Sequence, residues 1–225
     1  ARDYREEAYA TFLDIDRPVN YILFMEQVHD TKQRLLDTAQ ELFYSRSYAD
    51  VGVQEICEKA GVKKGSFYHF FPSKRDLTIA MLDESWNAFR DTMLKSASAA
   101  DVPPMQRIER LLDIVYLHQK STREQTGRVL GCPYGNLAGE MSTQDEMIRQ
   151  RVNRIFHDLE QPIEEALEEA VRAGDVKELD SHATAGAMVA YLEGVTLMAK
   201  TRNDVEVLRR LGPAMFRLAI PAEKG

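Results

Sequence analysis

The chain has 225 residues and a formal net charge of −7, with 29 lysines and arginines against 36 aspartates and glutamates. This length fits one large or two small domains, and a hydrophobic content of 44% is ordinary for a globular protein. The negative charge argues against a protein that coats nucleic acid through its overall charge, although a local basic patch is still possible. Two cysteines do not make a disulfide framework. No signal peptide is recognisable, so we expect a cytoplasmic protein.

Residues 1–29 precede the first clear helical pattern, and we treat them as an N-terminal extension. They hold three basic and six acidic residues, so a basic arm that enters the minor groove of DNA is not expected here. Met25 directly precedes the first strong pattern and is a plausible natural start.

The first predicted helix covers residues 31–44. Its apolar residues recur at helical spacing and form one stripe, which we expect to be buried. These residues are Leu35, Leu36, Ala39, Leu42 and Phe43.

Residues 54–60 and 64–71 predict two short helices joined by a tight turn. Gly61 can adopt the left-handed conformation that ends a helix. Phe67, Phe70 and Phe71 are spaced so that they can point inward together. The residues left to face outward are Lys64, Ser66, Tyr68 and His69.

The outward-facing residues of the predicted second helix suit contact with a nucleic-acid backbone. Residues 59–75 carry five lysines and arginines and no acidic residue. Cations, hydroxyls and an imidazole on one short helix match what a DNA groove offers, and a helix-turn-helix places its second helix there. The alternative is a helical hairpin of an ordinary all-α core with solvated lysines. The predicted DNA contacts are Lys63, Lys64, Gly65, Ser66, Tyr68, His69 and Lys74.

Residues 31–82 resemble the N-terminal DNA-binding domain of the TetR family of bacterial repressors. The matching segments are the leading helix TKQRLLDTAQELF, the AGV turn, the KGSFYHFF recognition helix and the PSK that opens the next helix. The resemblance implies an all-α protein: a three-helix helix-turn-helix domain over residues 30–77, then a larger helical ligand-binding and dimerisation domain over residues 78–225. Gly52 and Lys63 depart from the family pattern, because they replace residues that often cap helices.

Helical spacing predicts further helices along the rest of the chain, with a polar loop at residues 120–126. Ser73, followed by Asp76 three residues later, is close to a capping box for the first of them. Pro162 is expected to bend the predicted helix over residues 143–173. The predicted helices cover residues 73–95, 105–119, 143–173, 181–201 and 205–220.

The segment GRVLGCPYGNLAGEM, residues 127–141, has a glycine every four residues and a proline after its cysteine. A close-packed turn into a helix is one interpretation. The other is a pocket wall, in which Cys132, Tyr134 and Asn136 offer a thiol, a phenol and an amide. A free cysteine is usually a small buried hydrophobe. The alternative hypothesis is that Cys132 is a reactive sensor of electrophiles or oxidants.

From residue 183 to residue 199 the sequence is apolar nearly all round, with Glu193 as its lone charge. Glu193 and the flanking loops argue against a membrane span. A helix that is apolar on every side must be buried on every side, so one face can meet its own domain and the other a second subunit. The family resemblance implies that the last two helices form a four-helix interface with their symmetry mates.

These features together predict a homodimeric transcriptional repressor. Its two recognition helices would enter successive major grooves about 34 Å apart, so the double-stranded DNA operator should be near-palindromic. A small-molecule inducer, bound between the helices of the second domain, would release it. The candidate pocket residues are Trp86, Phe89, Tyr116, Cys132, Asn136 and Tyr191.

Two other classes of function compete with this prediction. An enzyme is disfavoured because the sequence offers no paired carboxylates, metal-ligand spacing or nucleophile triad. We accordingly predict no metal and no cofactor. The second competing class is a DNA-binding protein that works through a protein partner. A well-formed apolar cavity would favour the ligand-responsive regulator. A filled core would favour the protein that works through a partner.

Overall fold

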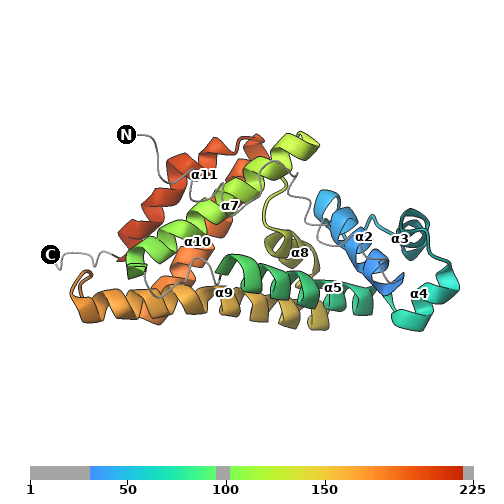
Figure 1. The fold of residues 1–225 in the computed structure, drawn as a ribbon, viewed down its shortest axis with the longest axis horizontal. Coiled ribbons are helices and arrows are strands. Elements are labelled where there is room, and N and C mark those ends of the chain that lie inside the picture. The colour runs from blue at the N-terminus through green and yellow to red at the C-terminus, as the bar shows by residue number, and fades with distance from the viewer. Residues whose placement is uncertain (1–30, 95–101, 220–225) are drawn as a thin grey trace.

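The computed structural model describes residues 31–94 and 102–219, and every regular element in that part of the chain is helical. The all-α fold class is therefore confirmed. The molecule is elongated, with α2, α3 and α4 at one end and a bundle of longer helices at the other (Figure 1). The expected N-terminal extension, residues 1–29, lies outside the described residues.

Helices α2, α3 and α4 form the small domain at one end. Leu35, Ile56 and Phe67 are fully buried where the three helices meet, as their spacing predicts. Phe70 is only partly buried and packs against this core. The bounds are α2 Thr31–Ser45, α3 Val53–Ala60 and α4 Lys64–Phe70.

The turn between α3 and α4 has the predicted chemistry. Gly61 has a φ of 65°, in the left-handed region, and its N–H donates to the carbonyl of Glu58. The N-terminal caps also agree with the sequence, because neither Gly52 nor Lys63 makes a side-chain capping bond. The turn geometry, rather than capping side chains, therefore sets the angle between these helices.

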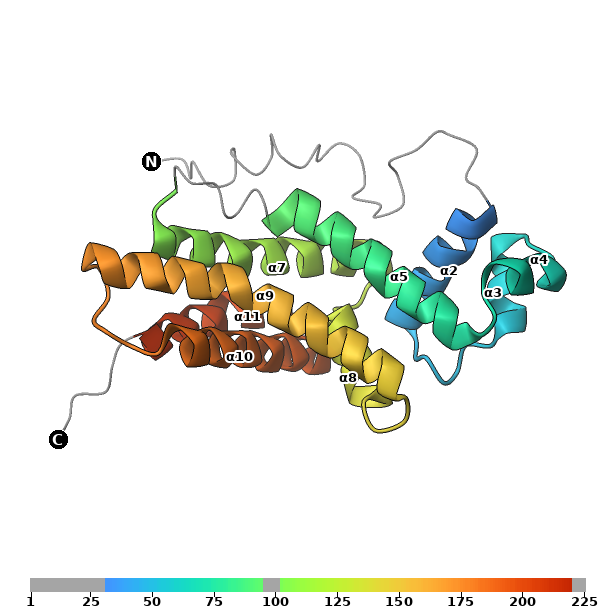
Figure 2. The same cartoon turned by 90° about the horizontal axis from the view of Figure 1, so that it is seen from below.

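Helix α5 (Lys74–Phe89) connects the small domain to the bundle and continues as a short π-helix, η1 (Arg90–Leu94). The Ser73 hydroxyl accepts from the Asp76 N–H, which confirms the predicted cap. Figure 2 shows α5 running from the small domain along the bundle. The proposed boundary between residues 77 and 78 falls inside α5, and one buried cluster extends from Leu35 through Trp86 to Ile155. A movement of the bundle can therefore reach the small domain through packed side chains.

The bundle contains the other helices of the described residues, and α10 packs against α9 along its length (Figure 2). Their bounds are α7 Pro104–Thr126, α8 Pro133–Met141, α9 Glu146–Ala173, α10 Ser181–Arg202, α11 Glu206–Leu211 and the 3₁₀ helix η2 Gly212–Ala219.

Three sequence-based boundaries are wrong. The predicted polar loop at 120–126 is helical, because α7 continues until Gly127 ends it with a φ of 75°. Helix α9 begins after Asp145, whose carboxylate caps it, rather than at residue 143. The last predicted helix changes to 3₁₀ geometry at residue 212, next to Pro213, which has no N–H to donate.

Helix α10 has the two-sided character that its sequence predicts. Ala185 and Met188 are fully buried against the rest of the bundle, whereas Leu197 on the other side is 60% exposed. Within the described ranges, no helix is long and apolar enough to cross a membrane. The outer face of α10 therefore remains available to another protein surface.

Candidate functional site

The outer surface of α4 carries the residues predicted to contact DNA. Tyr68 is 50% exposed. Lys63, Lys64, Gly65 and His69 are also exposed, while Ser66 is half-buried. A side chain at Gly65 would meet open space, so the internal packing of this domain does not demand a glycine there. The fold thus presents the set outward, and its contact with DNA stays a prediction.

Lys74 differs from the other predicted DNA contacts. Its ammonium donates to the carbonyls of Tyr48 (2.5 Å) and Val51 (2.7 Å) and lies 3.9 Å from the centre of the Tyr48 ring. Burial lowers the pKa of Lys74. The side chain therefore holds the turn between α2 and α3, and a phosphate at this position would instead meet the first backbone N–H groups of α5.

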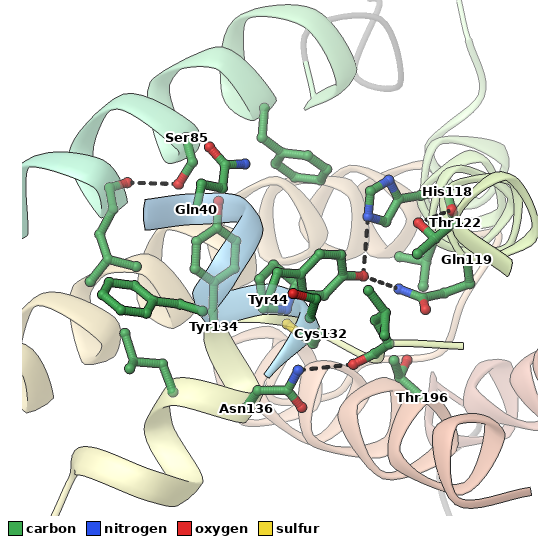
Figure 3. Close-up of a pocket in the computed structure, with 18 of the residues that line it drawn as sticks. Gln40, Tyr44, Ser85, His118, Gln119, Thr122, Cys132, Tyr134, Asn136 and Thr196 are labelled. Carbon is green, nitrogen blue, oxygen red and sulfur yellow. Dashed lines mark hydrogen bonds between the residues drawn. The ribbon is translucent and has the colours of Figure 1, made fainter. Parts of the chain in front are cut away.

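A cavity of about 550 Å³ lies between α2 and the helices of the bundle. Its walls come from α2, α5, α7, α8, α9 and α10 (Figure 3), and most of the surface that they present to the cavity is apolar. Three of the six candidate pocket residues, Phe89, Cys132 and Asn136, line it. A cavity of this size accommodates a drug-sized molecule.

The structure corrects the prediction for the other three pocket candidates, which do not line this cavity. Trp86 is 2% exposed and packs between the rings of Phe89 and Tyr134. The Tyr116 hydroxyl donates to Glu206 (2.9 Å) and the Tyr191 hydroxyl to the Leu211 carbonyl (3.0 Å). Both tyrosines therefore point toward α11 instead of into the cavity.

The sequence reasoning missed a polar group that joins the two domains at the cavity wall (Figure 3). The Tyr44 hydroxyl, on α2, donates to the Gly131 carbonyl at 2.8 Å. It also accepts from Gln119 Nε2 at 3.2 Å, and His118 Nε2 lies 3.4 Å from it. Gln119 in turn bonds to both the N–H and the carbonyl of Gly131. A ligand that separates the Tyr44 hydroxyl from Gly131 or Gln119 would act directly on α2.

Helix α8 provides a second link. At its start Cys132 and Asn136 line the cavity. At its end the Glu140 carboxylate accepts from the backbone N–H groups of Tyr48 (2.8 Å) and Ala49 (2.7 Å), in the turn that follows α2. One short helix therefore touches both the cavity and the DNA-binding domain.

The environment of Cys132 bears on its predicted alternative role as a sensor. Burial first, and then the carboxylate of Glu193, raises the pKa of this thiol well above its usual range. A reactive cysteine needs the opposite shift, because the thiolate is the nucleophile. The electrostatics favour Cys132 as a neutral wall residue, and its sensor role stays an untested prediction. Across the described residues, no group of three or more His, Cys, Asp or Glu side chains is placed to hold a metal ion.

Family models match both parts of the chain. Residues 35–81 match the model described as bacterial regulatory proteins, tetR family. Residues 104–215 match the model described as tetracyclin repressor-like, C-terminal domain. The two matched segments correspond to the helix-turn-helix end and to the bundle that holds most of the cavity wall.

Characterised relatives and solved structures point the same way. The chain is 30% identical to the HTH-type transcriptional regulator TtgR of Pseudomonas putida over 173 residues, which is 76% of this chain and 80% of TtgR. It is 26% identical over 192 residues to the HTH-type transcriptional repressor DhaR of a Mycobacterium species, covering 85% and 93% of the two chains. The reduced form of Escherichia coli NemR superposes with a TM-score of 0.73 at 26% identity, covering 87% of this chain and all of that one.

Proposed function

The chain belongs to the TetR family of bacterial transcriptional regulators, and from this premise we infer that it is a homodimeric repressor that a small-molecule ligand releases from a near-palindromic operator. Members of this family bind DNA and are not enzymes. One observation carries the ligand response: the wall of the 550 Å³ cavity includes Tyr44, from the DNA-binding domain itself. Occupancy of the cavity and the position of α2 are thereby coupled.

Release is then a shift between two populated arrangements. A ligand acts only through its different affinity for the DNA-binding state and the released state. A molecule that separates Tyr44 from Gly131, or moves α8 and with it Glu140, favours an arrangement in which α2 and α4 have moved relative to the bundle. In a dimer, such a movement changes the distance between the two recognition helices, which must match the groove spacing.

The outer face of α10 supports the dimer. Leu197 is 60% exposed, and Leu218 on η2 is 41% exposed. Met198, next to Leu197, is 39% exposed, and the remaining exposed positions of this face are small, so a second helix can approach closely. They are Ala183, Ala187, Ala190 and Gly194, at alternating spacings of four and three residues. The open cavity favours the ligand-responsive regulator over the alternative that acts through a protein partner.

Alanine variants of Lys64 and Tyr68 test the DNA surface. A dimer carries two copies of Lys64, so Lys64→Ala removes two phosphate contacts. It should weaken operator binding roughly 30-fold and reduce the slope of log K against log salt concentration by about 2. Tyr68→Ala should weaken binding without changing that slope, because the side chain is neutral. Fluorescence anisotropy of an operator duplex, measured across salt concentrations, gives both quantities.

The matched control is Lys177→Ala, which removes the same charge from an exposed residue in the turn between α9 and α10. It should leave the affinity and the salt slope unchanged. If the Lys64 and Tyr68 variants bind the operator as tightly as the parent, α4 is not the DNA-reading helix.

A further inference from the structure

Glu193 lies in the wall of the cavity and is the lone charged residue in the apolar stretch of α10 from residue 183 to residue 199. It packs against the first turn of α8, where a Cβ at Gly135 would lie 2.2 Å from Glu193 Oε2. The absence of a side chain at Gly135 therefore makes room for the carboxylate. This close fit fixes the position of the Glu193 carboxyl group in the cavity wall.

The other carboxylates in the wall have partners that satisfy them. Glu41 pairs with Lys59 at 2.6 Å, and Glu140 accepts two backbone N–H groups. Asp37 accepts from Gln33. Each of these groups is held by contacts within the protein.

Glu193 instead accepts from the neutral thiol of Cys132. In the described part of the chain, no lysine or arginine lies within ion-pair distance of it. Lys200, two turns further along α10, donates to Asn136 Oδ1 at 2.7 Å. Burial raises the pKa of Glu193, which is the response of a carboxyl group that lacks a compensating cation.

Aromatic rings complete the wall. Phe43, Tyr44, Phe89 and Tyr134 line the same cavity, and Figure 3 shows Tyr44 and Tyr134 entering it from different helices. The face of an aromatic ring attracts a cation, and this attraction strengthens when water is excluded. Among the residues that line the cavity, Arg46 is the only lysine or arginine, and it is paired with Glu55. His118 also lines the cavity, and burial lowers its pKa to about 4.

We propose that the ligand is an organic cation with a bulky apolar body, whose positive charge is neutralised by Glu193. This inference rests on the proposed function, in that it takes this cavity as the ligand site. Apolar side chains and aromatic rings hold the body of the molecule, and the carboxylate discriminates against neutral and anionic molecules of the same shape.

Tetraphenylphosphonium and tetraphenylborate form a matched pair of probes, because they have nearly the same size and shape and opposite charge. Equilibrium dialysis against the full-length protein, without DNA, should show binding of the phosphonium at least about tenfold tighter than that of the borate. Glu193→Gln, which keeps the shape of the side chain, should weaken phosphonium binding at least about 30-fold. Glu168→Gln, an exposed change on α9, should leave it unaltered.

Equal or tighter binding of the borate, no binding of the phosphonium, or full phosphonium affinity in a folded Glu193→Gln variant would each overturn the proposal. The comparison of the two ions in the parent protein decides the question even if that variant does not fold. Because dialysis needs no operator, a failure of DNA recognition leaves this test intact. Phosphonium binding that does not release operator DNA would support the cation site and count against ligand-driven release.

Discussion

Replacing Leu197 by aspartate is expected to convert the dimer to a monomer and to weaken operator binding about a thousandfold. Leu197 is 60% exposed and lies on the outer face of α10, beside small residues that allow a second helix to approach. A twofold interface would bring the new carboxylate together with apolar surface of the partner subunit, which makes its burial costly. A monomer binds only one half-site of the operator, so it loses the additional affinity that a dimer gains by binding both half-sites at once.

Light scattering after size-exclusion chromatography gives the mass of the Leu197→Asp variant, and anisotropy gives its operator affinity. Met147→Asp is the matched control, because Met147 is 52% exposed at the start of α9, away from the proposed interface. An aspartate in the first turn of a helix is favourable, so this control should stay folded and dimeric. A folded Leu197→Asp variant that remains a dimer would place the subunit interface elsewhere.

When the pH falls from 7 to 4, the free energy of unfolding of the parent protein should decrease by up to about 3 kcal/mol more than that of a His118→Asn variant. Burial lowers the pKa of His118 to about 4 from its ordinary value of 6.5. The unfolded chain therefore takes up this proton first as the pH falls, and stability is lost between about pH 6.5 and pH 4. Asparagine has no such proton, so the variant should lack this part of the loss.

Urea unfolding at a series of pH values, run in parallel on the two proteins, isolates this contribution from the other titrating groups. His182→Asn is a contrasting control. The carboxylate of Glu164 raises the pKa of His182, so its contribution is present at low pH and is lost as the pH rises. The His182→Asn variant should therefore not show a smaller loss of unfolding free energy at low pH than the parent protein does. Parallel curves for the parent and His118→Asn would show that His118 is not held neutral at the cavity wall.

The small domain is largely predictable from the sequence because its determinants are local. Phe67 and Ile56 are buried where helical spacing places them, and Gly61 ends α3 in the left-handed conformation that the turn requires. The polar end of α7 was predicted as a loop because its last two turns have few apolar residues, yet nothing before Gly127 terminates the helix.

The cavity was predictable only in part, because periodicity shows that a face is buried but not what covers it. Tyr116 and Tyr191 lie on buried faces as expected, but those faces meet α11 rather than the cavity. Tyr44 belongs to a helix of the DNA-binding domain, and its bond to Gly131 joins residues 87 positions apart in the chain. Such a contact depends on how the domains pack, which no local pattern encodes.

The measurement that tests operator recognition most directly is the binding of the purified protein to DNA that flanks its own gene. Anisotropy should be recorded for that duplex and for a scrambled duplex of the same composition, across salt concentrations. We predict tight binding to the native duplex only, with a steep decrease as salt rises. Equal affinities for the two duplexes at every salt concentration would contradict a repressor that reads a specific operator through α4.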